Sequence, residues 1–521
     1  MSYFINKLYE LIKVFYPTKS SKKFIEFNKK IWIKKNDNYY NKGEILLDLF
    51  HHYPFVNIWS YIVNIIKDKK KLKVRYFYFY FYLGLLNQSK FYSFKLKKIY
   101  ESFNVKEGID ERNNNFNKSN KRIEKIFQSL SSKKKLLNFT YKNIKIGDLL
   151  YDTYLRTKLE PTVDINDIHL KNLTIRAINI FDHISNYLKK NNVKLIIVSH
   201  PYYIQYGIIT RIACKNKIPV LMIYSKSRGH DIFRLKLIDR KHPVEDFKYY
   251  NYKKKFLSLK SKKNRLNIGK RLIKDRFSKK FLDQLPYMKK NIYINRKKFQ
   301  INQKKSNDVY IFAHDFFDNP HRFRWMIFED FLEQIKFLEK IAAKTPNLNW
   351  FLKPHPNAID KNYEIFYKIF ANFKYIKLVD KDLNNFEIIN KKPKFVITNH
   401  GTVAHEFAYH KIPVINTGDN LHINYNFCLH AKNKKNLEKI IIHFEKFKKK
   451  INFDKKNIYE FTYMDYFYSR NQYNEFKLDK MKIWSSHSDY DDCLDYYTKQ
   501  PKKNINLLKN YINNFLAKNL D

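Results

Sequence analysis

Residues 393–418 read PKFVITNHGTVAHEFAYHKIPVINTG and predict a strand, a polar turn, a helix and a second strand. The apolar runs at both ends are rich in β-branched residues, which is typical of buried parallel strands. Glycine permits close backbone approach, threonine caps helices, and N–H groups at a helix start attract anions. We therefore expect a βαβ unit that binds an anion at its turn, with an ordinary capped helix as the alternative. The turn consists of Asn399, His400, Gly401 and Thr402.

Glu406 follows Thr402 by four residues and so lies one turn further along the same helical face. From there its carboxylate would accept hydrogen bonds from sugar or ribose hydroxyls, or would only favour the helix dipole. His405 and His410 flank it, but their spacing of five residues turns them to different faces. That spacing excludes the helix motif of the zinc proteases, which needs four.

A second stretch, residues 350–356, reads WFLKPHP. Its two prolines fix φ and bias the residues before them away from helix. Because the segment is already stiff, Lys353 and His355 would lose little conformational entropy when they bind a ligand. A cation and an imidazole donor suit a phosphate leaving group, whose charge grows as the bond breaks. We expect Lys353 and His355 to form one phosphate-binding site with the polar turn and Glu406.

The stretch FAHDFFDNPH follows another predicted strand and gathers two carboxylates and two imidazoles. Their spacing matches no standard metal site, so we expect a loop that shapes the substrate pocket and no metal. The chain does contain Asp489-Tyr490-Asp491, but this triplet lies in a polar tail far from any predicted strand end. We interpret the triplet as coincidence. The residues of the substrate-shaping loop are His314, Asp315, Asp318 and His321.

The chain of 521 residues carries 102 Lys and Arg against 49 Asp and Glu, a formal charge of +53. Such an excess is typical of proteins that bind nucleic acid or anionic membranes. Abundant Lys, Asn, Ile, Phe and Tyr with only 9 Gly equally fit A/T-rich codons. Residues 306–430 carry 15 basic against 14 acidic residues, whereas residues 251–305 carry 20 against 2. We expect the basic segment 251–305 either to lie on anionic lipid headgroups or to form a solvated lysine-rich face.

The N-terminal residues MSYFINKLYELIK lack the continuous apolar core of a signal peptide. The longest apolar run, residues 76–86, is shorter than the roughly 20 residues that span a bilayer. The three cysteines match no zinc or disulfide spacing. We therefore expect a cytoplasmic protein, at most peripheral on the inner face of the cytoplasmic membrane.

Strands alternate with helices from about residue 140 onward, which predicts parallel sheets. The fold class we predict is α/β, with two Rossmann-like domains facing a cleft and an additional mainly helical N-terminal region. A helix is expected over residues 324–343. The expected parts are a helical accessory region (1–135), a first domain ending in the basic linker (136–300), a second domain (301–465) and a C-terminal helical tail (466–521).

Ligands of open parallel sheets bind beyond the carboxyl ends of the strands. His200, His314 and His355 all fall just past predicted strand ends. A catalytic base for an acceptor hydroxyl would be a carboxylate or imidazole from the domain opposite the phosphates. Asp148 and His200 qualify by position, although Asp148 equally fits a cap on the next helix.

Five stretches between about residues 140 and 430 carry a family resemblance: IGDLLYDTYLR (146–156), SHPYYIQYGIITRIA (199–213), FAHDFFDNPH (312–321), WFLKPHP (350–356) and HGTVAHEFAYHKIPVI (400–415). Together they resemble the glycosyltransferases of bacterial capsule and surface-polysaccharide biosynthesis, which have the two-domain GT-B fold. The resemblance implies that His355 and Thr402 bind the phosphate of a nucleotide donor and that Glu406 binds its ribose. The acidic-acidic-Gly base motif of the sialyltransferases is missing from this chain.

The resemblance implies a metal-independent glycosyltransferase without a cofactor. It would move a sugar from a nucleotide sugar on the second domain to a growing lipid-linked surface glycan, of capsule or lipopolysaccharide type, on the first. Transfer of a polyol phosphate and epimerisation of a nucleotide sugar stay open as related activities. Charge alone predicts a nucleic-acid-binding protein, but the near-neutral residues 306–430 argue against it, so we expect no nucleic-acid partner. An anionic membrane is a further expected partner, through residues 251–305.

Overall fold

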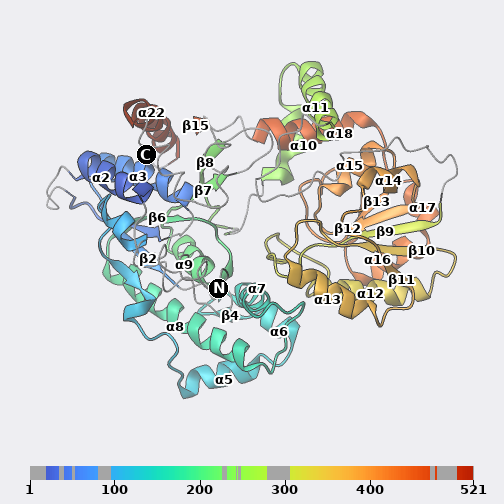
Figure 1. The fold of residues 1–521 in the computed structure, drawn as a ribbon, viewed down its shortest axis with the longest axis horizontal. Coiled ribbons are helices and arrows are strands. Elements are labelled where there is room, and N and C mark those ends of the chain that lie inside the picture. The colour runs from blue at the N-terminus through green and yellow to red at the C-terminus, as the bar shows by residue number, and fades with distance from the viewer. Residues whose placement is uncertain are drawn as a thin grey trace, which may run out of the picture.

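The computed structural model describes residues 19–33, 40–49, 53–79, 96–225, 232–241, 243, 248–278, 306–469, 476–477 and 501–519. The N-terminal residues 1–18, residues 279–305 of the basic segment, Cys493 and the triplet at 489–491 lie outside this part of the chain. Within it, two α/β domains each surround a mainly parallel sheet (Figure 1). The predicted α/β class with two Rossmann-like domains is confirmed.

The first domain is built on a seven-stranded sheet with the order β15-β8-β7-β6-β1-β2-β3. The five strands from β7 to β3 are parallel, and β8 and β15 add to one edge in antiparallel pairings. The strands are β1 (Glu44–Asp48), β2 (Lys73–Tyr78), β3 (Gly108–Asp110), β6 (Val193–Val198), β7 (Val220–Ser225), β8 (Ile232–Leu237) and β15 (Phe476–Lys477).

Both faces of this sheet are covered, because side chains of a strand alternate between faces and both sets are apolar here. In β1, Ile45 and Leu47 join one core with Trp59, while Leu46 joins the opposite core with Ile196. A short hairpin of β4 (Thr140–Tyr141) and β5 (Ile144–Lys145) precedes α7. The helices are α2 (Lys19–Trp32), α3 (Tyr53–Lys70), α5 (Lys121–Ser129), α6 (Lys133–Leu137), α7 (Gly147–Lys158), α8 (Ile168–Lys190) and α9 (Tyr203–Lys215), with a 3₁₀ turn η2 (Glu111–Asn113).

The expected accessory region 1–135 is instead part of the first domain. Its strand β1 lies beside β6 in the middle of the sheet, with Ile45 opposite Leu195. A buried ion pair also joins Glu111 to Arg176 of α8, with 2.6 Å between Glu111 Oε1 and Arg176 Nε. The boundary expected at residue 136 therefore does not separate two folding units, because parallel pairing joins segments about 150 residues apart.

The second domain is built on a six-stranded parallel sheet with the order β11-β10-β9-β12-β13-β14. The strand, helix and strand predicted from residues 393–418 are β12 (Phe395–Thr398), α15 (Val403–Tyr409) and β13 (Val414–Asn416). The other strands are β9 (Asp308–Phe312), β10 (Asn349–Lys353), β11 (Ile376–Leu378) and β14 (Leu429–His430). The other helices are α12 (Phe331–Ala343), α13 (Asp360–Phe370), α14 (Asn385–Asn390), α16 (Lys434–Ile442), α17 (Phe444–Lys448), α18 (Lys455–Thr462) and the π-helix η4 (Tyr463–Tyr468).

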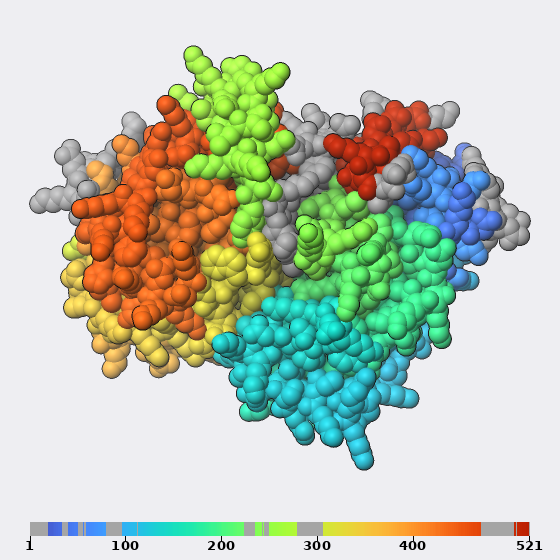
Figure 2. Space-filling model, turned by 180° about the vertical axis from the view of Figure 1, so that it is seen from behind, coloured from blue at the N-terminus to red at the C-terminus, as the bar shows by residue number. Residues whose placement is uncertain are grey.

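The described part of the basic segment belongs to the second domain rather than to the first. It forms η3 (Lys248–Asn251), α10 (Tyr252–Leu257) and α11 (Lys262–Arg276), and α11 packs against α18 and η4. A Cβ at Gly269 would lie 2.0 Å from the carbonyl oxygen of Tyr459, so this close helix contact requires glycine. Figure 2 shows α11 standing out from the surface.

The C-terminal tail returns to the first domain. Its helix α22 (Pro501–Asn519) packs against α3, and β15 pairs with β8 (Figure 1). Among the described residues, no helix combines the length and the apolar character needed to cross a membrane.

Deleting residues 1–135 tests whether this region is part of the first domain. We expect the chain 136–521 to fail to fold, because the deletion removes β1 and exposes the apolar edge of β6. Expression followed by circular dichroism and thermal unfolding measures the outcome. A truncated chain that unfolds cooperatively at the temperature of the full chain would contradict the shared sheet.

Candidate functional site

The second domain gathers polar side chains at one edge of its sheet. β9, β10 and β12 are neighbouring parallel strands, so the residues that follow their carboxyl ends meet at the same edge. His314 follows β9, His355 follows β10, and the turn 399–402 follows β12. The structure therefore brings together three of the predicted motifs.

The closest contacts at this edge surround Gly401. A Cβ at Gly401 would lie 2.8 Å from Thr398 Oγ1 and 3.9 Å from His314 Nε2, so the backbone approaches both groups closely. Both atoms are buried and have no hydrogen-bond partner among the described residues. Buried polar groups are almost always hydrogen-bonded, to protein, water or ligand. This pair of polar atoms is therefore suited to receive a polar ligand.

The imidazoles here are stacked and held neutral. The ring centroid of His314 lies 4.3 Å from that of His400 and 5.2 Å from that of Phe331. Burial lowers the pKa of His314 to about 3 and the pKa of His400 well below its usual value, and the charges nearby add to the effect. At neutral pH each ring therefore offers one N–H donor and one acceptor rather than a full charge.

Lys353 and His355 differ in their surroundings. Lys353 is 2 % exposed, and its Nζ donates to Asn385 Oδ1 at 3.1 Å. Burial lowers the pKa of Lys353 to about 8. Lys353 thus acts from beneath the edge rather than extending into solvent as its proline-stiffened sequence led us to expect.

His355 is solvent-exposed at the turn after β10. The protein around it partly desolvates the ring, which lowers the pKa of His355. The backbone N–H of Asn357 donates to His355 Nδ1 at 3.2 Å. Because Nδ1 accepts this bond, the neutral ring carries its proton on Nε2 and presents that N–H outward as a donor.

Glu406 and Thr402 do not take the positions expected of them. Glu406 is 0 % exposed, and its Oε1 lies 2.7 Å from Nε of Arg276 at the end of α11. This ion pair joins α11 to α15, so the carboxylate is not presented to a ribose. Thr402 makes no side-chain capping hydrogen bond to α15.

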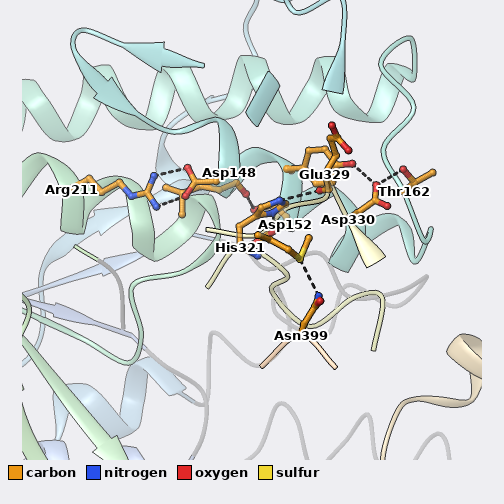
Figure 3. Close-up of polar contacts among 12 residues, drawn as sticks. Asp148, Asp152, Thr162, Arg211, His321, Glu329, Asp330 and Asn399 are labelled. Atoms are coloured by element: carbon orange, nitrogen blue, oxygen red, sulfur yellow. Dashed lines mark hydrogen bonds and ion pairs between the residues drawn. The ribbon is translucent and has the colours of Figure 1, made fainter. Parts of the chain in front are cut away.

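Asp148 is paired rather than positioned as a base. Its two oxygens accept from Nη1 and Nη2 of Arg211, both at 2.7 Å (Figure 3). Burial would raise the pKa of Asp148, but the charge and hydrogen bonds of Arg211 outweigh it and hold the pKa below its usual value. A carboxylate in such a bidentate pair is a poor proton acceptor at neutral pH. Asp148 is thus the partner of Arg211 in this structure, and its role as the base stays a prediction.

His321 joins the two domains and also lines a cavity between them. Its Nδ1 lies 2.6 Å from Asp152 Oδ1 of α7, and its Nε2 lies 3.0 Å from the carbonyl oxygen of Glu329 (Figure 3). Burial lowers the pKa of His321, but the carboxylates around it, Asp152 first, outweigh burial and raise it. The Glu329 carbonyl can only accept, so Nε2 donates to it, and Nδ1 shares a proton with Asp152, whose pKa is also raised by burial.

Asp330 completes this contact between the domains. It is fully buried at the start of α12, where its Oδ1 accepts from the N–H of Glu333 at 2.8 Å. Its Oδ2 accepts from the hydroxyls of Tyr151 and Thr162 of the first domain (Figure 3). The expected helix 324–343 thus begins only at Phe331, because the preceding residues are used in the contact.

The remaining loop residues face the first domain. Asp315 Oδ1 accepts from the N–H of Phe317 at 2.8 Å, and burial raises the pKa of Asp315. Asp318 is exposed and lies within electrostatic reach of both His355 and Tyr203, the first residue of α9. These two carboxylates therefore lie where the sheet edges of the two domains oppose each other.

The first domain contributes His200 and a residue that sequence reasoning missed. His200 follows β6, half-buried, with its ring centroid 4.5 Å from that of Tyr206. Beside it, Ser199 Oγ donates to Asp48 Oδ2 at 2.6 Å. Asp48 is 2 % exposed, and burial raises its pKa to about 7. An acidic residue at the end of the apolar run EILLD was a usable signal, but it lay in the region that we had assigned to an accessory role.

Metal binding has no structural candidate in the described ranges, where no group of three or more His, Cys, Asp or Glu side chains is arranged to hold an ion.

No protein-family model and no curated protein matches this chain. Among solved structures, the UDP-GlcNAc 2-epimerase from Neisseria meningitidis bound to UDP-GlcNAc is 12% identical and covers 81% of this chain and 98% of its own, with a TM-score of 0.25. The β-Kdo 2,4 transferase KpsC of Thermosulfurimonas dismutans is 12% identical over 52% of this chain and 79% of its own, with a TM-score of 0.31. The wall teichoic acid polymerase TagF is 10% identical over 100% of both chains, with a TM-score of 0.19. Likenesses this distant do not decide the reaction or the substrate.

Asp48→Asn tests the buried carboxylate through the pH dependence of stability. The folded-state pKa of Asp48, about 7, lies above its usual value of 3.8, so the native state holds the proton more tightly than the unfolded chain does. The stability this provides is full below about pH 4 and is lost as pH rises to about 7. Asparagine does not titrate, so we expect the Tm of the variant, relative to that of the wild type, to rise between pH 5 and pH 8.

Ser199→Ala provides the companion measurement. The Ser199 hydrogen bonds lower the pKa of Asp48, so removing the hydroxyl should move the loss of stability to higher pH. Thermal unfolding of the wild type and both variants across the same buffers checks this. A difference between Asp48→Asn and wild type that stays constant with pH would contradict the raised pKa.

Proposed function

We propose that this protein is a metal-independent glycosyltransferase that binds the phosphates of a nucleotide sugar at the edge of its second sheet. One observation carries the proposal: the buried, unpartnered His314 Nε2 and Thr398 Oγ1 converge on Gly401 at the carboxyl ends of parallel strands. Phosphate oxygens are acceptors that such groups and nearby backbone N–H groups can satisfy. The resemblance of the surrounding motifs to surface-polysaccharide glycosyltransferases supports the same assignment.

The charges around the edge suit a leaving phosphate. His355 presents its Nε2–H from the neighbouring turn, and the buried Lys353 supplies positive potential from below. In a site of low dielectric, preorganised donors stabilise charge that develops as the sugar bond breaks. Within the proposal, His355 and the turn 399–402 contact the phosphates, and Lys353 acts through space.

The acceptor glycan would bind at the first domain. His200 lies past the end of β6, and Tyr203 begins α9 at the same edge, within electrostatic reach of Asp318. We assign His200 as the group that takes the acceptor proton, because Asp148 is held in its pair with Arg211. Asp48, with a pKa near neutrality, lies behind it next to Ser199.

A growing lipid-linked surface glycan is the acceptor we propose, with the protein peripheral on the cytoplasmic membrane. Support comes from α10 and α11, which carry exposed cations and Leu257 at 61 % exposure on a projecting part of the surface (Figure 2). Each cation near an anionic leaflet contributes about 1 kcal/mol. The exposed cations used in this argument are Lys254, Lys255, Lys262, Lys263, Lys270 and Arg271.

His355→Ala tests the phosphate site. Thermal stabilisation by CMP, CDP, UDP, GDP and ADP, with and without magnesium, first identifies the nucleotide. We expect one nucleotide to stabilise the wild type without magnesium, and the variant to bind it about 10- to 100-fold more weakly, since a hydrogen bond to a charged group is worth about 1.5–3 kcal/mol. Turnover of the matching nucleotide sugar should fall with it.

His443→Ala is the matched control, because His443 is also exposed and lies at the start of α17, away from the sheet edge. It should bind the nucleotide like the wild type. If no nucleotide stabilises the protein, or if His355→Ala binds as tightly as the control, the proposed phosphate site is wrong. Turnover without any acceptor would identify an epimerase, and a phosphodiester product would identify a polyol-phosphate transferase.

Glu406→Ala should lower the stability of the folded protein, and not only its affinity for the nucleotide donor. The change removes the buried partner of the Arg276 guanidinium, and breaking one side of a buried ion pair costs about 3–5 kcal/mol. Chemical denaturation measures this cost. A variant with wild-type stability and lost nucleotide binding would restore the ribose role that the sequence suggested.

A further inference from the structure

A large cavity lies between the domains, beside the proposed phosphate site: Phe323, which lines the cavity, has its ring centroid 4.5 Å from that of His400. Its volume is about 1220 Å³, and it is lined by the start of α7, the end of α9, residues 323–329 and residues 433–435. α9 begins at the sheet edge of the first domain with Tyr203 and ends at this cavity with Lys215. Neither His355 nor Gly401 is among the described residues that line the cavity.

The walls of this cavity are strongly cationic. Nine Lys and Arg side chains line it against two carboxylates, and both carboxylates are already paired, Asp148 with Arg211 and Glu329 with Lys434. Six of the cations form no ion pair with any described residue, so their positive potential faces the cavity unbalanced. These six are Lys134, Lys145, Lys215, Arg240, Lys241 and Lys435.

Two further features point to a ligand. Arg211 is 7 % exposed and lines the cavity, and its Nε is buried without a hydrogen-bond partner among the described residues. Trp325, 36 % exposed, and Phe323 add aromatic surface to the same walls. Aromatic faces beside polar donors suit a ligand that is both apolar and hydrogen-bonding, such as a sugar ring.

We propose that this cavity binds an anionic oligosaccharide that carries phosphate or carboxylate groups. Its volume exceeds that of most small-ligand pockets, about 300–1,000 Å³, and so accommodates several sugar units. The preference for anions rests on the charges of the walls. The choice of a carbohydrate rests on the proposed function, because an enzyme that extends a glycan must hold units beyond the one that reacts.

Both domains contribute cations, so a bound anion would touch both. Lys134, Lys145, Lys215 and Lys241 come from the first domain, and Lys435 comes from the second. An anionic chain in this cavity therefore stabilises the arrangement in which α7 and the residues 321–330 are in contact.

The test measures binding of a fluorescently labelled sialic acid oligomer, a dextran oligomer of equal length and a single-stranded DNA of equal charge, in 150 mM salt. The cavity variant is Lys215→Glu, Lys241→Glu and Lys435→Glu. The matched control is Lys262→Glu, Lys263→Glu and Lys270→Glu on α11, which makes the same charge change at equally exposed positions. Thermal unfolding verifies that both fold; if the cavity variant does not, Lys241→Gln and Lys435→Gln replace it.

We expect the cavity variant to weaken binding of the sialic acid oligomer at least 10-fold and the control to weaken it less than 2-fold, with dextran bound far more weakly by all. Equal weakening in both variants, or equal binding of dextran, would overturn the proposal. Tighter binding of the DNA, with the same dependence on the cavity cations, would replace the carbohydrate by a nucleic acid. Thermal stabilisation by the nucleotide should be the same in the wild type and in both variants. If no nucleotide stabilises the wild type, the phosphate site is wrong, whereas the binding of the sialic acid oligomer tests the cavity.

Discussion

The contact between α7 and residues 321–330 is the constraint on which the functional arrangement depends. The His321 ring lies between Asp152 and the Glu329 carbonyl, and Asp330 accepts from Tyr151 and from Thr162. These groups are buried, so each needs its partner and tolerates little displacement. The contact sets how the two sheet edges oppose each other, and it also forms part of the boundary between the phosphate site and the cationic cavity.

Local pattern was enough to predict the sheet of the second domain. The strands near Val309, Leu352 and Val396, and the loops after them, were predicted because apolar runs and turn residues are local signals. Contacts between residues far apart in the sequence could not be predicted from local pattern. Asp148 meets Arg211, Glu406 meets Arg276, and Ile45 lies opposite Leu195, each across 63 residues or more. Without those partners, Asp148 was assigned as a catalytic base, Glu406 was assigned to the ribose of a donor, and residues 1–135 were assigned to a separate region.

Burial also changes what the predicted site residues can do. The sequence places cations and imidazoles in the predicted phosphate site, which suggests that positively charged side chains attract the phosphate. In the structure His314 and His400 are neutral, and Lys353 has a pKa of about 8. Recognition at this edge therefore depends more on directed hydrogen bonds than on net charge, and the excess of lysine lies elsewhere, on α11 and around the interdomain cavity.

The path of the C-terminal tail has a mechanical consequence. The chain passes from the first domain to the second before η3, and it returns after η4 so that β15 and α22 join the first domain. Two covalent tethers therefore connect the domains where a simple two-domain chain has one. A single tether lets one body swivel about a point, whereas two tethers define a line and leave rotation about that line as the easy motion. The two tethers therefore restrict rotation of one domain against the other to a single axis.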